Sequence, residues 1–211
     1  MTKFLIAVPT FENVSTETFE SIYNLQIPPT VDVELYFAKG YDCARARNRI
    51  VEHAIAENYD YIFMVDSDIV LPNDALLKLY EVPTKIILGA YPRKNEPSKS
   101  ELFDVRWDNY APSARWNIAE LTANRFTRDG QPITAIPVLG GGFGCALLKT
   151  DIFKSGLLSK PWFKYVDYGD GDLLSEDLYF CENARRHGFK IYANTTFVCG
   201  HIKREVITYE K

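Results

Sequence analysis

Short apolar runs alternate with stretches of helical periodicity along the first part of the chain. The runs expected to form strands cover residues 3–8, 31–37, 59–65 and 85–90, and the helical stretches between them cover 14–25, 42–58 and 71–80. Strands that alternate with helices form a sheet of largely parallel strands, because each helix carries the chain back across one face of the sheet. This alternation predicts an α/β fold with helices on two faces of the sheet.

The second part of the chain shows a weaker pattern. Residues 91–131 are polar and aromatic without long periodicity, so we expect an irregular segment there. Order is expected to return with strands at 136–139 and 145–148, a helix from Thr150, a helix from Ser175 to Gly188, and last strands at 190–193 and 196–199. Because the chain has 211 residues and no internal repeat or linker, we expect residues 1–211 to form one domain.

The composition excludes several classes of protein. A formal net charge of −4 argues against general nucleic-acid binding, which needs a basic surface to neutralise phosphates. No apolar run approaches the ~20 residues that span a bilayer, and Met1 leads into a strand rather than into a signal peptide. The four cysteines form no C-x-x-C pair, so we expect free thiols in a reducing compartment. We therefore expect a cytoplasmic protein without a membrane span.

Two carboxylates follow the strand expected at 59–65. Asp66 and Asp68 flank Ser67 directly after the apolar run, which places them at the carboxyl end of a buried strand. Open α/β sheets bind their ligands at that end. Carboxylate oxygens suit Mg²⁺ or Mn²⁺, and such an ion can neutralise a diphosphate. A D-x-D pattern alone is also compatible with solvated acids in a turn, but its position after the strand favours a cation site.

Six short motifs occur in an order and spacing that are typical of one enzyme class. They are IAVPT at 6–10, ARN at 46–48, DSD at 66–68, GGGFGCALL at 140–148, SEDL at 175–178 and CGH at 199–201. Together they resemble the GT-A glycosyltransferases, especially family-2-like members, and the resemblance covers nearly the whole chain. The chain is also similar to the amino-terminal domain of a larger glycosyltransferase encoded by a chlorella-type algal virus.

The resemblance implies a single Rossmann-like GT-A domain with a mixed central sheet. It implies a nucleotide-binding half at about residues 1–92 and an acceptor and catalytic half at about 93–211. It also implies a nucleotide-diphosphate sugar as donor, a carbohydrate acceptor and Mn²⁺ or Mg²⁺ as cofactor. A viral protein of this kind would carry further domains in the full-length chain and would act in the host cytoplasm.

The family pattern also implies which residues hold the metal. Asp68 would ligate it, while Asp66, beside Ser67, would approach the nucleotide ribose and stand next to the metal as a further ligand. His201 matches the late histidine that ligates the metal in many of these enzymes. By chemistry alone a lone histidine is more often structural, and a Gly-His pair at a strand end brings the two interpretations to about even.

Further donor contacts are implied at the ends of the first strand and the second helix. Pro9 and Thr10 resemble the segment that lines the nucleotide base, and Glu12 belongs to the same segment. Arg47 and Asn48 match the ARN position, where a cation faces the nucleotide or its diphosphate. The competing interpretation of this position is a solvated, arginine-rich face of the helix.

Two more residues are assigned to the donor by similar reasoning. Arg93 is expected to contact the donor phosphate or sugar. The run 140–144 does not match a dinucleotide fingerprint, since the last glycine of G-x-G-x-x-G would fall on Cys145 and an apolar strand follows. Glycine allows a backbone to approach a ligand closely, so we expect Gly142 in the floor beneath the donor sugar or acceptor.

Glu176 and Asp177 begin a predicted helix and form the second acidic pair. A transfer with inversion needs a base to take the proton of the acceptor hydroxyl as it attacks the anomeric carbon. The family pattern favours Asp177 as this base, with Glu176 beside it. The alternative is that both acids only complement the positive end of the helix dipole.

Taken together, these features predict a metal-dependent glycosyltransferase that transfers a hexose, with a UDP-sugar favoured as donor. An inverting mechanism follows if Asp177 is the base, but a retaining enzyme could use the same metal site. A nucleotidyltransferase usually has a glycine-rich basic loop after the first strand, whereas residues 9–12 are acidic and free of glycine. An inactive carbohydrate-binding domain of the same fold is the alternative from another class.

Overall fold

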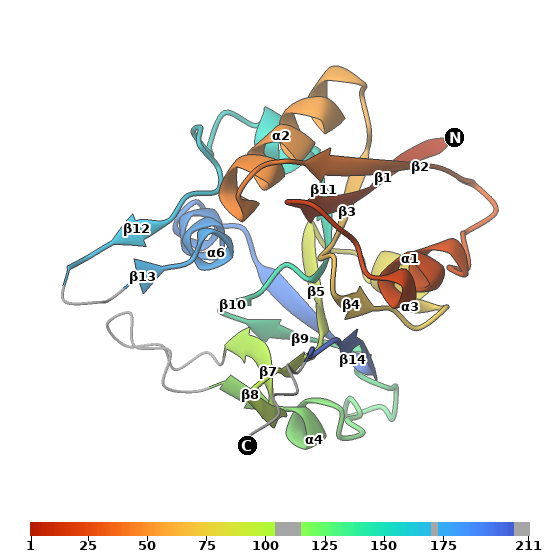
Figure 1. The fold of residues 1–211 in the computed structure, drawn as a ribbon. Coiled ribbons are helices and arrows are strands. Elements are labelled where there is room, and N and C mark those ends of the chain that lie inside the picture. Colours follow the sequence, from red (N-terminus) through yellow and green to blue (C-terminus); the bar gives the residue numbers. More distant parts are fainter. Residues whose placement is uncertain (104–114, 170–172, 205–211) are drawn as a thin grey trace, which may run out of the picture.

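A mixed sheet of seven strands forms the centre of the protein (Figure 1). The computed structural model describes residues 1–103, 115–169 and 173–204. The strand order is β2–β1–β3–β11–β5–β14–β9. The strands are β1 (Thr2–Thr10), β2 (Val31–Lys39), β3 (Tyr61–Val65), β5 (Ile86–Ala90), β9 (Ala135–Val138), β11 (Cys145–Lys149) and β14 (Ile191–Val198). The expected α/β class with a mixed central sheet is confirmed.

Neighbouring strands of this sheet pair in both senses. β1 pairs in parallel with β2 and β3, as strands joined by helices should. β11 lies antiparallel between β3 and β5, and β5 pairs in parallel with β14. β9 forms the far edge, antiparallel to β14. Because β11 runs against both of its neighbours, β3 and β5 point the same way and their carboxyl ends share one edge of the sheet.

Helices cover both faces of the sheet, as expected. They are α1 (Thr16–Tyr23), α2 (Cys43–Ala56), α3 (Ala75–Tyr80), α4 (Ile118–Leu121), α5 (Asp151–Lys154) and α6 (Glu176–Arg186). α2, α5 and α6 pack on the face to which β1 contributes Leu5 and Ala7. α1 and α3 pack on the other face, against Phe4, Ile6 and Val8. Successive side chains of a strand point to opposite faces, so β1 contributes to two cores.

Local features mark one end of each of the three longest helices. The Ser15 hydroxyl accepts a hydrogen bond from the Thr18 amide at 3.2 Å at the start of α1. The Asp42 carboxylate accepts from the Arg45 amide at 3.0 Å at the start of α2. Gly188 follows α6 with a φ of 82°, a left-handed conformation that favours glycine. The Asp42 hydrogen bond fixes where α2 begins and Gly188 fixes where α6 ends, and both helices contribute to the site described below.

Part of the segment 91–131 forms a smaller sheet, which corrects the expectation of an irregular segment. Its strands are β6 (Pro92–Arg93), β7 (Glu96–Phe103), β8 (Arg115–Asn117) and β10 (Gly140–Gly141). β7 is central, pairing antiparallel with β6, β8 and β10. Residues 104–114 lie outside the described residues. A strand of two or three residues is too short to show the alternation of polar and apolar side chains. In addition, β10 lies outside the segment 91–131. The local sequence pattern therefore could not reveal this sheet.

The last predicted strands, 190–193 and 196–199, are also corrected, because they form the single strand β14. Its register shifts between Ala193 and Val198. The Asn194 side chain accepts from the Thr196 amide at 2.8 Å and donates to the Lys78 carbonyl at 2.9 Å. These polar residues interrupt the apolar pattern of the sequence without ending the strand.

Two short strand pairs complete the described structure. β12 (Val166–Asp167) pairs with β13 (Leu173–Leu174), and β4 (Ile69–Val70) pairs antiparallel with β15 (Gly200–His201). The second pair carries the end of the described chain to the turn that follows β3. Among the described helices, none is long and apolar enough to cross a membrane.

Candidate active site

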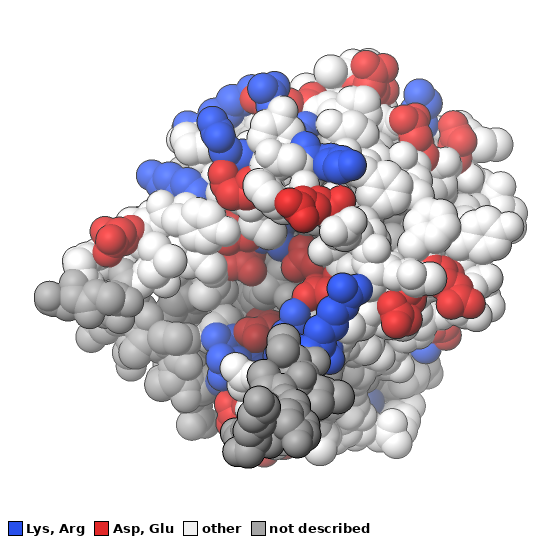
Figure 2. All heavy atoms as spheres, in the orientation of Figure 1, with Lys and Arg blue, Asp and Glu red and all other residues white. Residues whose placement is uncertain are grey.

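A cavity of about 230 Å³ opens at the carboxyl ends of β3 and β5. Carboxylates, aromatic rings, an arginine and a histidine line it. The lining residues are Asp66, Asp68, Tyr91, Glu101, Phe103, Arg115, Gly142, Ser175, Asp177, Leu178 and His201. Figure 2 shows acidic side chains around a hollow near the middle of this face, with basic side chains beside them. Segments that lie far apart in the sequence, from Asp66 to His201, therefore meet at the strand ends where α/β sheets bind ligands.

Backbone hydrogen bonds position the D-x-D segment at one wall of the cavity. The Asp66 amide donates to the Gly144 carbonyl at 3.1 Å, and the Ile69 amide donates back to the Asp66 carbonyl at 3.1 Å. The Ile202 amide donates to the Asp68 carbonyl at 2.9 Å, beside the β4–β15 pair. These bonds bring His201 next to Asp68, as the metal prediction requires.

Asp68 sits between an imidazole and an ammonium group. Its Oδ2 atom lies 3.6 Å from Nε2 of His201 and forms an ion pair with the Lys94 ammonium group. Burial would raise the pKa of Asp68, but the hydrogen bonds from His201 and Lys94 outweigh it and lower this pKa to about 2. Burial opposes charge on His201, yet its contacts with Asp68 and the Pro92 carbonyl raise the pKa of the imidazole. Asp68 is therefore an ionised carboxylate that already attracts cations.

Within the described residues, no three carboxylate, imidazole or thiol groups converge as a metal-binding set. Asp68 and His201 lie together, whereas the Asp66 carboxylate turns toward Arg47. The Nδ1 atom of His201 lies 2.7 Å from the Pro92 carbonyl, a contact that directs Nε2 toward Asp68. A carboxylate oxygen and an imidazole nitrogen are ligands that Mn²⁺ accepts, so this pair fits a divalent cation that displaces Lys94.

Arg47 lies beneath this wall rather than on a solvated helix face. It projects from α2 and is only 2% exposed. Its Nη2 atom lies 2.9 Å from Oδ1 of Asp66, and its Nη1 donates to Oε1 of Glu176. The guanidinium carbon is 5.8 Å from the centre of the Phe143 ring. The alternative of a solvated face is therefore wrong for Arg47, although it describes the exposed Arg45.

The start of α6 forms the opposite wall. Asp177 lines the cavity, and its Oδ1 atom accepts hydrogen bonds from the Ser175 hydroxyl and, at 2.8 Å, from the Leu178 amide. Neither of these hydrogen bonds involves the Oδ2 atom of Asp177. Glu176 is only 4% exposed and does not line the cavity, since its carboxylate points to Arg47. The two adjacent acids thus have different surroundings, and Asp177 is the one that faces the cavity.

The donor-contact residues expected in the first half lie around the cavity rather than in its lining. Pro9 and Thr10 are buried at the end of β1, and the Thr10 hydroxyl donates to the Asn13 carbonyl at 2.7 Å. Glu12 is exposed in the following turn, and Ser67 is half-buried in the D-x-D turn. Pro9 and Thr10 are therefore the last residues of β1, and Glu12 and Ser67 lie in the segments that follow β1 and β3.

Asn48 and Arg93 are engaged in contacts within the protein. The Asn48 amide nitrogen donates to the carbonyls of Ala44 and Phe163, each at 2.7 Å, and its oxygen accepts from the Trp162 amide at 2.9 Å. Arg93 forms ion pairs with Glu96 at 3.2 Å and with Glu101 at 3.3 Å. Asn48 therefore anchors the segment around Phe163, and Arg93 lies one contact away from the cavity.

The smaller sheet contributes cavity residues that sequence reasoning did not assign. Arg115 forms an ion pair with Glu101 and stacks over the Phe103 ring, 4.2 Å from its centre. Tyr91 accepts a hydrogen bond from the Gly144 amide at 3.2 Å and packs against Gly142. The signal available was the two-residue period of a strand, which puts Glu101 and Phe103 on the same side of β7, but the irregular appearance of the whole segment obscured it.

Comparison with known proteins finds similar structures but no similar sequence. No known sequence family matches the chain, and no curated protein matches it by sequence. A197 from STIV aligns over 97% of this chain and 87% of its own, with a TM-score of 0.61 and 15% identity. A variant of β-1,4-galactosyltransferase 7 from Drosophila, in complex with manganese, UDP-Gal and xylobiose, aligns over 97% and 72%, with a TM-score of 0.51 and 16% identity.

A third structure, GalNAc-T7 with UDP, GalNAc and Mn²⁺, aligns over 97% of this chain but only 44% of its own, with a TM-score of 0.60 and 11% identity. Together with the seven-stranded mixed sheet, these likenesses show that the fold is that of the GT-A glycosyltransferases. The closer resemblance to family-2-like members stays a prediction, since no known sequence family matches.

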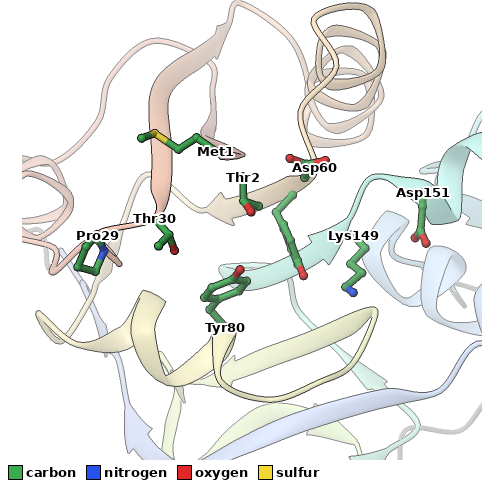
Figure 3. Close-up of a pocket in the computed structure, with 9 residues that line it drawn as sticks. Met1, Thr2, Pro29, Thr30, Asp60, Tyr80, Lys149 and Asp151 are labelled. Atoms are coloured by element: carbon green, nitrogen blue, oxygen red, sulfur yellow. The ribbon is translucent and has the colours of Figure 1, made fainter.

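A larger hollow of about 870 Å³ lies at the opposite end of the sheet (Figure 3). Its lining consists of Met1, Thr2, Pro29, Thr30, Asp60, Tyr61, Tyr80, Lys149 and Asp151. Thr2 begins β1 and Tyr61 begins β3, so this hollow is at the amino ends of the parallel strands. It is separate from the cavity at the carboxyl ends and provides positions for control substitutions.

Proposed function

We propose that this chain is a metal-dependent glycosyltransferase that transfers a hexose from a nucleotide-diphosphate sugar, with a UDP-sugar favoured, to a hydroxyl of a glycan or other acceptor. One observation carries the proposal. A cavity at the carboxyl end of a GT-A sheet has an Asp68–His201 pair on one wall and Asp177 on the other. Two solved structures of this fold contain UDP-Gal with manganese and UDP with Mn²⁺, which supports the proposal.

The donor is proposed to bind along the loops that follow β1 and β3. Pro9, Thr10 and Glu12 would surround the base, and Asp66 with Ser67 would approach the ribose. Asp68 and His201 would hold Mn²⁺ or Mg²⁺, which when bound neutralises the charge of the departing diphosphate. Ionised Asp68 binds the cation, and the Pro92 carbonyl keeps the imidazole of His201 turned toward it.

The acceptor is proposed to enter from the second half of the chain. Asp177 accepts the proton of the acceptor hydroxyl. At the same time the oxygen of that hydroxyl attacks the anomeric carbon, and the bond between this carbon and the diphosphate breaks. The hydrogen bonds from Ser175 and Leu178 hold its Oδ1 atom, so the carboxylate has one orientation for this transfer. Attack opposite the leaving group inverts the anomeric centre. Glu101 and Arg115 would contact sugar hydroxyls, and Arg93 would support them through Glu101.

The division into a nucleotide-binding half at about 1–92 and an acceptor half at about 93–211 belongs to the same proposal. The cavity lining supports it, because Asp66, Asp68 and Tyr91 come from the first range and Glu101 to His201 come from the second. Gly142 also lines the cavity and packs against Tyr91, where a Cβ atom would overlap the Tyr91 hydroxyl.

A panel of nucleotide sugars tests the proposal. UDP- and GDP-sugars, each with and without Mn²⁺, are screened for their effect on the melting temperature of the wild-type protein and of Lys149→Ala, a substitution in the hollow of Figure 3. We expect one donor class to raise the melting temperature of both proteins only with the metal, because ligand binding to the folded state stabilises it. A lack of response to every donor contradicts the proposal. Glycan binding without donor or metal favours the inactive carbohydrate-binding alternative.

A further inference from the structure

One buried guanidinium contacts both walls of the cavity. Arg47 pairs with Asp66, which comes two residues before the proposed metal ligand Asp68, and with Glu176, which directly precedes the proposed base Asp177. Asp66 and Glu176 belong to different elements, the end of β3 and the start of α6. We propose that Arg47 is a positioning residue that sets the separation between the metal wall and the base wall. This inference rests on the proposed function of the site.

The burial of Arg47 separates this role from a direct contact with the donor. Only 2% of the residue is exposed, it does not line the cavity, and both Nη atoms already contact protein carboxylates. A diphosphate in the cavity would meet Asp66 and Asp68 before it reached this guanidinium. Arg47 therefore acts on the reaction through Asp66 and Glu176, rather than on the donor phosphate as the sequence motif suggests.

The unsatisfied nitrogen of Arg47 supports the same role. Within the described residues its Nε atom is buried without a hydrogen-bond partner. A buried donor without a hydrogen bond lowers the stability of the fold. The observed position of the side chain therefore does not maximise its own hydrogen bonds. Its two outer nitrogens instead face two carboxylates, and the Phe143 ring packs beside the plane. The guanidinium fork suits this task, since a lysine ammonium is a single point of charge.

The charge balance gives Arg47 a second effect on both walls. The positive charge of Arg47 lies within ion-pair distance of two negative charges, the Asp66 carboxylate and the Glu176 carboxylate. Without the arginine, the buried Glu176 carboxylate and the partly exposed Asp66 carboxylate would lose the cation that both contact. An uncompensated charge is costly there, so both side chains would move, and this change would displace the segments that carry Asp68 and Asp177.

The first test compares Arg47→Lys with Arg49→Ala, an exposed position on the same helix. Mn²⁺·UDP affinity is measured by calorimetry, and kcat is measured for hydrolysis of the accepted donor. For Arg47→Lys we expect a kcat about 100-fold lower and an affinity within about threefold of wild type, because a displacement of about 1 Å costs this much in rate. Arg49→Ala should match wild type in both. An equal loss of affinity and kcat in Arg47→Lys, or no loss of kcat, overturns the proposal.

The second test does not depend on activity. Hydrogen exchange is followed at the Ile69 amide, bonded to the Asp66 carbonyl, and at the Tyr179 amide, bonded to the Ser175 carbonyl. In Arg47→Lys we expect both amides to exchange at least about tenfold faster, while the central strand β5 keeps its wild-type rates. Unchanged rates at these two amides, or an equal rise throughout the protein, overturn the positioning role. If no donor is accepted but both amides respond as expected, the proposed function fails and the positioning role stands.

Discussion

The Asp68 carboxylate lies 3.6 Å from Nε2 of His201, and the Nδ1 atom of the same ring lies 2.7 Å from the Pro92 carbonyl. This relationship joins the turn after β3 to the strand β15 near the end of the described chain. Because the two side chains lie together, substitution of both Asp68 and His201 should abolish the proposed metal binding.

We predict that His201→Asn lowers the affinity for Mn²⁺ by at least about tenfold, because the substitution removes the imidazole ligand and its orienting contact with Pro92. Manganese binding is measured by electron paramagnetic resonance titration. His187→Asn is the matched control, since His187 is an exposed histidine at the end of α6. Equal manganese affinity in the wild-type protein and His201→Asn would exclude His201 as a ligand.

Asp177→Asn is expected to reduce kcat by a factor of about 10² to 10⁴, the usual contribution of a general base, with little change in Mn²⁺·UDP affinity. The substitution keeps the shape of the side chain and removes its basicity. Asp167→Asn, an exposed acid in β12, serves as the control. A product with the same anomeric configuration as the donor, measured by nuclear magnetic resonance, would instead identify a retaining enzyme.

Gly142→Ala should destabilise the fold by about 1–3 kcal/mol, because its new Cβ would collide with the Tyr91 hydroxyl. Tyr91→Phe alone should cost about 1 kcal/mol, since it removes the acceptor of the Gly144 amide hydrogen bond. In the double variant, the free energy of unfolding should fall by less than the sum of the two single losses, because removal of the hydroxyl relieves the collision. Urea denaturation of the four proteins measures this, and additive losses would show that the two residues do not clash.

Tyr59 should make stability depend on pH in the alkaline range. Burial and the hydrogen bond to Glu34 raise the pKa of Tyr59 to about 12 from its usual value of 10.0. The folded protein thus keeps this proton more tightly than the unfolded chain, and its contribution to stability is present below pH 10.0 and lost as pH rises toward 12. Tyr59→Phe should lose less stability than wild type between these values in urea denaturation. Parallel losses in the two proteins would contradict the pKa shift.

The large elements of the fold were predictable because their patterns are local. The apolar run of β3, the cap at Asp42 and the glycine at 188 each lie within a few residues of the structure that they specify. The smaller sheet was not predictable in this way, because β10 contributes only two glycines and joins β7 from a distant part of the chain. Sequence pattern therefore missed Glu101 and Arg115 as cavity residues.

The sequence motifs indicated several of the residues that line the site, but they did not indicate which side chains would form ion pairs with one another. Asp68, Asp177 and His201 lie at the cavity, as their motifs suggested. The partner of Arg47 could not be read from sequence, because its two carboxylates come from β3 and α6 and meet only in the folded chain. The Arg47 motif indicated a cation near the donor, whereas its burial makes it a link between two walls.

Release of UDP from UDP-sugars, measured with and without Mn²⁺, tests the glycosyltransferase account most directly. The wild-type protein and Lys149→Ala should both release UDP with Mn²⁺, and Asp68→Asn should release it at least about 100-fold more slowly, because the ion that stabilises the leaving diphosphate loses a ligand. The account is contradicted if the wild-type protein releases no nucleotide from any UDP- or GDP-sugar, or if Asp68→Asn is as fast as wild type.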